Sequence, residues 1–146
     1  MEVSLALRRA YFKKLNGNIT LDGDTIPVFD AYALPEDVTY PYVLLSSQVN
    51  VQRGVKCNTK MYNSTILVDI VTGDIDPIGR EQSEVIANKI ETLVYPDNDT
   101  DLDLTDDGWE IGHTQREQDF DSSQRSDVYY IFRKLIRYEH LISKTK

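Results

Sequence analysis

The sequence predicts an α+β fold: a mostly antiparallel sheet of four to five strands, two helices packed on one face, and a β-hairpin extension. Three observations lead to this prediction. Residues 63–94 have the pattern of a strand, a tight turn and a helix, and residues 3–15 have a second helical pattern. Several further apolar segments with strand-like alternation are separated by turn residues. The length of 146 residues fits a single domain, residues 1–146.

The strand–turn–helix unit is the clearest element. Ile66, Val68 and Ile70 alternate, so they share one face of an extended chain. Gly73 is suited to the turn, and Asp76-Pro77 is a typical start of a helix. The apolar face of that helix is predicted from residues spaced by three and four: Ile78, Gln82, Val85, Ile86, Ile90, Leu93 and Val94. The simplest burial of both faces lays the helix across the sheet.

The segments before this unit supply the first helix and more strands. The helix over residues 3–15 is predicted to end at Asn16-Gly17, with its basic residues solvated. Asp22-Gly23 predicts a turn, and residues 26–33 predict a strand that Pro27 places at a strand start or a sheet edge. A further strand follows Tyr40-Pro41-Tyr42, with one face predicted to carry Val43, Leu45, Val49 and Val51.

Residues 95–127 are predicted to be an acidic or polar loop or arm within the domain. One register of this stretch matches the ligand positions of a calcium-binding loop: Asp99, Asp101, Asp103, Thr105, Asp107 and Glu110. Leu104 stands where that pattern needs glycine, and the alternative is a solvated acidic loop. Residues 109–114 fit a short strand, and residues 115–127 a long hairpin loop or a mobile arm. Phe120 in this arm is a candidate interface residue, either an anchor on a partner subunit or a side chain folded back on its own domain.

The last element, residues 128–142, fits both a helix and a strand. Its apolar residues have helical spacing, but they also alternate, with Lys134 as the single exception. The β-branched and aromatic run Val128–Phe132 favours a strand, which is our prediction.

The order of these elements resembles the tail-terminator or tail-completion family of bacteriophage head–tail connector proteins. The resemblance covers residues 3–94: a helix, then V-F-D-A-Y-A-L-P, a Y-P-Y-V-L-L strand, T-I-L-V-D-I-V and an amphipathic helix. It implies a non-enzymatic virion protein, assembled in the bacterial host cytoplasm. It also implies a sixfold or twelvefold homo-oligomeric ring. The implied partners are connector, portal-side and tail proteins, with DNA passing through the channel without specific binding.

Composition and motifs agree with a protein that has no catalytic site. The net charge of −8 argues against a protein that coats nucleic acid, and no apolar run approaches the roughly 20 residues of a membrane span. No nucleotide-binding or paired-cysteine motif is present, so no cofactor is predicted. His113 and His140 are expected to be surface or packing residues. Asp69 stands alone in mid-strand on the face opposite the core. Together with the acidic loop it suggests a metal-dependent nuclease; the alternative is a position on a solvent or interface face.

Candidate interface or channel residues follow from exposure expected on the strands and loops. Arg53, Lys56 and Lys60 are the charges of the loop 53–62, which is read as a solvated hairpin tip or as a projection toward DNA or a neighbouring subunit. Leu67 and Val71 lie on the second face of their strand and are expected to be exposed there. Three hypotheses result: a ring-forming virion protein, a small soluble binding module with a calcium-binding loop, and a nuclease-like enzyme.

Overall fold

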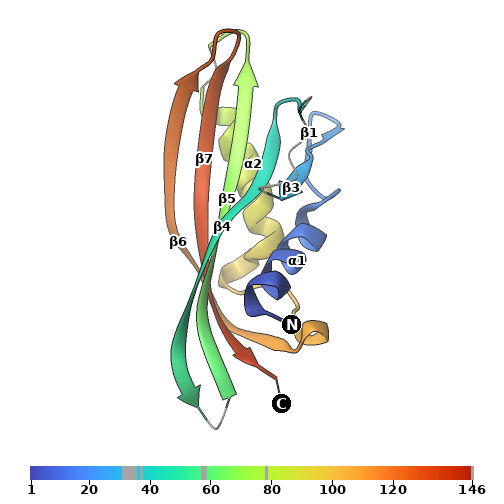
Figure 1. The fold of residues 1–146 in the computed structure, drawn as a ribbon. Helices are drawn as coiled ribbons and strands as arrows, with labels where there is room; N and C mark the ends of the chain where they lie inside the picture. The colour runs from blue at the N-terminus through green and yellow to red at the C-terminus, as the bar shows by residue number, and fades with distance from the viewer. Residues whose placement is uncertain (31–35, 37, 57–58, 78, 146) are drawn as a thin grey trace.

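The computed structural model describes residues 1–30, 36, 38–56, 59–77 and 79–145 (Figure 1). It confirms the α+β prediction: a five-stranded sheet in the order β3-β4-β5-β7-β6 carries two helices on one face. The helices are α1 (Val3–Leu15) and α2 (Glu81–Val94). The strands of this sheet are β3 (Val28–Asp30), β4 (Tyr42–Lys56), β5 (Thr59–Asp74), β6 (Trp109–Arg125) and β7 (Tyr130–Lys144). A separate small hairpin pairs β1 (Thr20–Leu21) with β2 (Asp24–Thr25) around the predicted turn.

The core lies between the helices and the sheet. Ile66, Val68 and Ile70 of β5 are fully buried on this face, as their alternation predicts. Helix α1 buries Leu7 and Tyr11 against them, and its bounds match the predicted ones. Burial of a large apolar side chain stabilises a fold by roughly 1.5–3 kcal/mol, so this layer is the main source of stability.

Helix α2 begins later than predicted. It starts at Glu81, with Arg80 at the N-cap position, and not at Asp76-Pro77. Ile78, which we expected on its apolar face, lies outside the described residues, as do residues 31–33 of the predicted strand 26–33. Val85 is 38% exposed, so the buried face of the helix is shifted toward Ile86, Ala87 and Ile90.

Strand β4 does not keep one apolar face along its length. Its register against β5 shifts between Leu45 and Gln48, which marks a β-bulge. The extra residues of a bulge change the face to which the following side chains point. Val43 and Leu45 are therefore buried under the helices, whereas Val49 and Val51 are about half exposed, at 51% and 54%. The prediction that all four share one face is wrong.

The second half of the chain contains more strand than predicted. Strand β6 continues to Arg125 and pairs with β7 throughout, so the prediction of a loop or arm over residues 115–127 is wrong for most of that range. The final segment is a strand, β7, as predicted. The exception in its alternation, Lys134, is buried, and its ammonium lies 3.2 Å from the carboxylate of Glu84 in α2.

The acidic segment, residues 95–108, connects α2 to β6. It contains two short 3₁₀ turns, η1 (Pro96–Asn98) and η2 (Thr105–Asp107). The other face of the large sheet has no helix over it in the described structure (Figure 1). This helix-free face is the one to which Asp69, Val71, Arg133 and Phe120 belong by register. Among the described residues, no helix is both long and apolar enough to cross a membrane.

Candidate interaction surfaces

The acidic segment does not gather its carboxylates around one point. Asp101 pairs with Lys14 of α1, and Asp107 lies 4.0 Å from Arg9. Asp103 accepts hydrogen bonds from the Thr105 amide and hydroxyl, which lower the pKa of its carboxyl group. Within the part of the chain that the structure describes, no three His, Cys, Asp or Glu residues are placed to hold a metal ion.

Two leucines explain why this segment is ordered. Leu102 and Leu104 are buried in the main core, at 8% and 2% exposure. The remaining residues of the predicted calcium register do not contribute to a shared site. Asp99 accepts a hydrogen bond from the adjacent Thr100 amide, and Glu110 lies exposed on β6. The acidic segment therefore contributes two leucines to the core and pairs with basic residues of α1.

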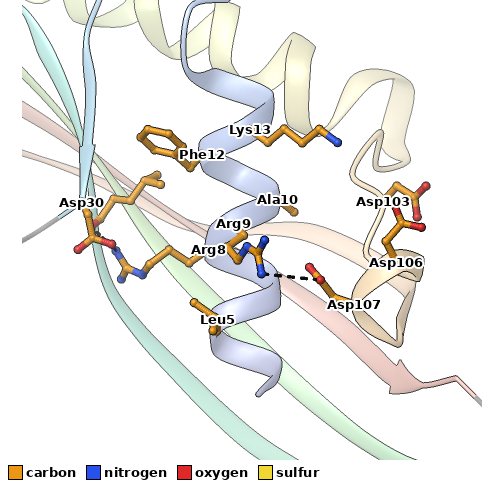
Figure 2. A pocket seen from close by; sticks show the side chains of 11 residues that line it. Leu5, Arg8, Arg9, Ala10, Phe12, Lys13, Asp30, Asp103, Asp106 and Asp107 are labelled. Carbon is orange, nitrogen blue, oxygen red and sulfur yellow. Dashed lines mark hydrogen bonds and ion pairs between the residues drawn. The ribbon is translucent and has the colours of Figure 1, made fainter. Parts of the chain in front are cut away.

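A groove of about 530 Å³ runs along the outer side of α1 (Figure 2). Arg9 and Lys13 face the acidic segment across it, and Figure 2 shows Arg9 reaching toward Asp107. Leu5 and Phe12 are exposed on the same helix, at 49% and 41%. The groove combines charges of both signs with exposed apolar side chains, a composition suited to contacts with another surface.

Arg8 behaves differently from the solvated basic residue that the sequence predicts. Its guanidinium extends along the side of α1 that lies away from the acidic segment. There it pairs with Asp30 at 3.2 Å and donates to the backbone carbonyls of Leu45 and Ser46 at the bulge of β4. Its Nε also donates to the side chain of Gln48 at 2.9 Å. No sequence signal marks this role, because it depends on the position of the bulge.

The helix-free face is more buried than the sequence suggests. Val71 is fully buried in a small cluster with Tyr42 and Ile131, and Leu67 is only 8% exposed. The prediction that Leu67 and Val71 are exposed is therefore wrong. Large aromatic side chains cover the end of this face near Val71, and Leu67 stands opposite Arg137, whose aliphatic stem is long enough to shield it.

Asp69 is part of a buried ion pair on that face. It is 2% exposed, and its Oδ2 lies 3.0 Å from Nη1 of Arg133 on β7. Burial raises the pKa of this carboxyl group, and the Arg133 charge opposes that shift. A carboxylate that is enclosed and already neutralised by arginine does not offer the open coordination that a nuclease metal needs.

The remaining candidates lie on exposed parts of the sheet. Phe120 is 40% exposed on β6, opposite Leu135. Arg53 and Lys60 are exposed near the end of the long β4–β5 hairpin; the side chain of Lys56 and the tip itself lie outside the described residues. This pair of strands forms the predicted hairpin extension, and Figure 1 shows it projecting beyond the helices.

His140 is a packing residue, as expected. It is fully buried between α1 and the sheet, where Nε2 lies 2.6 Å from the Tyr11 hydroxyl and Nδ1 lies 2.8 Å from the Thr114 hydroxyl. Burial lowers its pKa to about 3. The imidazole is therefore neutral at pH 7, and it joins α1, β6 and β7 through polar contacts.

Comparisons with known proteins identify the fold. No family model matches the sequence, and none of the curated proteins is a significant match. Among solved structures, the fold is similar to that of a chain from the virion of a native gene transfer agent particle, with a TM-score of 0.67 and 14% sequence identity. The likeness covers 95% of this chain and 97% of that chain. At this identity the similarity shows a shared fold, which extends over nearly the full length of both chains.

Proposed function

We propose that this protein is a structural component of a phage-like virion. It forms a homo-oligomeric ring, sixfold or twelvefold, at the head–tail connector or the head-proximal end of the tail, where it completes the tail and joins it to the head. The observation that carries the proposal is the fold shared with a virion chain over nearly the full length of both chains. The proposal assigns the protein no catalytic step and no cofactor.

The arrangement of the sheet supports this role. The β4–β5 hairpin and the β6–β7 hairpin project at opposite ends of the molecule (Figure 1), so a ring of copies presents different surfaces to portal-side and tail proteins. A closed ring also buries subunit surfaces that a lone chain leaves exposed. The net charge of −8 supports a channel that repels DNA phosphates and lets the genome pass without specific binding.

The test is the assembly state of the purified protein. We expect sedimentation velocity across a concentration series to show a discrete ring, and negative-stain images to show a closed ring with a central opening. The same measurements at high salt separate a packed ring from loose charge-driven association. A protein that remains monomeric up to its solubility limit, with no rings in the images, contradicts the proposal.

A further inference from the structure

We propose that copies of this protein join edge to edge: the open edge of β4 beyond its bulge, residues 49–56, extends the sheet of a second copy at the first half of β6, residues 109–116. The inference rests on the proposed ring and names the surfaces that form it. The argument depends on which edges of the sheet remain unpaired, on strand direction and on charge.

Among the described residues, the outer edge of β4 is paired only at its beginning. Strand β3, Val28–Asp30, pairs there with Val43–Leu45. Arg8 then satisfies the carbonyls of Leu45 and Ser46, and Gln48 donates from its side chain to the Ser4 carbonyl at 2.9 Å. From Val49 onward, no described segment other than β5 pairs with the strand.

The first part of this open edge, residues 49–52, lacks the usual protection against a neighbour. Isolated proteins commonly blunt an edge strand with proline, lysine or a very short length. Residues 49–52 read Val-Asn-Val-Gln, without proline or charge, and both valines are about half exposed. Exposed β-branched residues on a strand with one open edge are typical of a strand that gains stability when a further strand is added.

Strand β6 forms the opposite edge of the same sheet and pairs with β7 alone. Apart from that pairing, the backbone of residues 110–116 makes no hydrogen bond to any other described segment. Its first half lies at the height of the open part of β4. Gln52 stands opposite Tyr62, Tyr62 opposite Ile142, and Ile142 opposite Ile111.

Strand direction then fixes the kind of junction. Strand β4 is antiparallel to β5, β5 is antiparallel to β7, and β7 is antiparallel to β6. Strands β4 and β6 therefore run in opposite directions. A rotation about an axis roughly along the strands preserves these directions. It places β6 of one copy beside β4 of the next as an antiparallel pair, and this head-to-tail contact can close into a ring.

Charge favours this pairing over a pairing of β4 with itself. Residues 49–56 contain basic residues and no acid, so two copies of this segment repel each other. Glu110 of β6 is exposed and pairs with Ser143, which pairs with Met61. On the other edge, Arg53 lies in the register shift that stands opposite Met61, between the pairs Gln52–Tyr62 and Val55–Lys60. Opposite charges across neighbouring strands are stabilising, and like charges are destabilising.

The junction is short, and closure of the ring compensates for this. A register shift between Gln52 and Val55 limits the regular part of β4 at this edge. Shifts between Ile111 and His113 and between Arg116 and Gln118 limit that of β6. A short ladder keeps single contacts weak, whereas a closed ring makes one contact more than an open chain of the same copies. In such a ring the sheets are continuous, and the helix-free face is one wall of the assembly.

The test combines edge variants with hydrogen exchange. In the Val49→Lys/Val51→Lys variant, the changes lie at exposed positions, so we expect a folded monomer by circular dichroism and a lost ring by sedimentation velocity. Val128→Lys is the matched control, because Val128 is 60% exposed in the β6–β7 turn and should leave the ring intact. Arg53→Glu and Glu110→Arg should each weaken the ring, and the double exchange should restore it.

Hydrogen exchange on the unmodified ring tests the same contact without substitution. Only alternate amides of an edge strand point away from its partner strand. Within residues 50–52 and 113–115, we expect those that point away from β5 and β7 to exchange slowly in the ring and fast in the monomeric double-lysine variant. A ring that survives both lysines, or one with fast exchange at these amides, overturns edge pairing and leaves the proposed ring standing. If Glu110→Arg leaves assembly unchanged while the lysine variant abolishes it, β6 is not the partner strand. A wild-type protein that forms no ring contradicts the proposed function itself.

Discussion

Acidification should destabilise the fold through His140. This side chain is fully buried, and its two ring nitrogens contact the hydroxyl groups of Tyr11 and Thr114. A neutral imidazole donates one hydrogen bond and accepts one, which suits two hydroxyl partners. A charged imidazole at this position has no carboxylate beside it in the contacts that the structure describes, so burial lowers its pKa to about 3.

The sign and size follow from the two pKa values. In the unfolded chain the pKa of a histidine is close to 6.5, and in the folded protein the pKa of His140 is about 3. Between these values the unfolded chain binds a proton that the folded protein does not bind, so the free energy of unfolding falls as the pH falls. Each pH unit below the unfolded pKa removes about 1.4 kcal/mol, and the change from about pH 7.5 to about pH 5 amounts to about 2 kcal/mol.

The assay is urea unfolding at a series of pH values and constant ionic strength, kept above about pH 5 so that most carboxyl groups remain ionised. In His140→Gln, which keeps a donor and an acceptor, we expect lower stability at pH 7 but a much flatter pH dependence. The matched control is His113→Gln, at the exposed histidine, which should keep the wild-type slope. The reasoning is refuted if His140→Gln retains that slope, or if NMR shows the His140 ring titrating near 6.5 in the folded protein.

Three further experiments test other parts of the structure. Arg133→Met should lower the free energy of unfolding by about 3 kcal/mol, because it leaves the buried Asp69 carboxylate without its cation. Adding Asp69→Leu to this variant should recover much of the loss, as measured by urea unfolding. Gly73→Ala should cost about 1–3 kcal/mol, since a Cβ there would lie 2.7 Å from the Tyr40 ring, whereas Gly79→Ala has no atom within 4 Å and should be nearly neutral in the same measurement. Millimolar calcium should leave the melting temperature unchanged, because carboxylates of the acidic segment pair with α1; an increase in melting temperature would contradict this placement.

The strongly periodic elements could be predicted from the sequence. Helix α1 has the expected bounds because its apolar spacing and the Asn16-Gly17 stop agree. Strand β7 could be recognised because β-branched and aromatic residues outweighed its helical spacing. In both elements the buried face is continuous, and the hydrophobic pattern therefore identifies it.

Strand β6 could not be predicted at its full length, because much of it is exposed at the edge of the sheet. A strand of this kind needs no apolar alternation, so its polar residues 115–125 look like a loop. The bulge in β4 was missed for a different reason. It depends on pairing with β5, and a change of one position moves every later side chain to the other face.

The candidate surfaces could not be predicted from the sequence, because they depend on three-dimensional packing and strand pairing. Leu67 and Val71 have the pattern of an exposed second face, and only the three-dimensional packing of aromatic residues on that face shows that they are buried. The open edges of β4 and β6 carry no motif at all, because they are defined by the strands that do not pair with them. The acidic segment matches a calcium-binding register but forms no shared site, because its carboxylates contact α1 or the adjacent backbone.

The length of the strands sets the reach of a single copy. Strand β6 has 17 residues, and at about 3.3 Å per residue it spans roughly 55 Å. Strands β4, β5 and β7 are nearly as long, so the large sheet is an elongated structure. Two partners bound at the opposite hairpins would therefore stand about 50 Å apart.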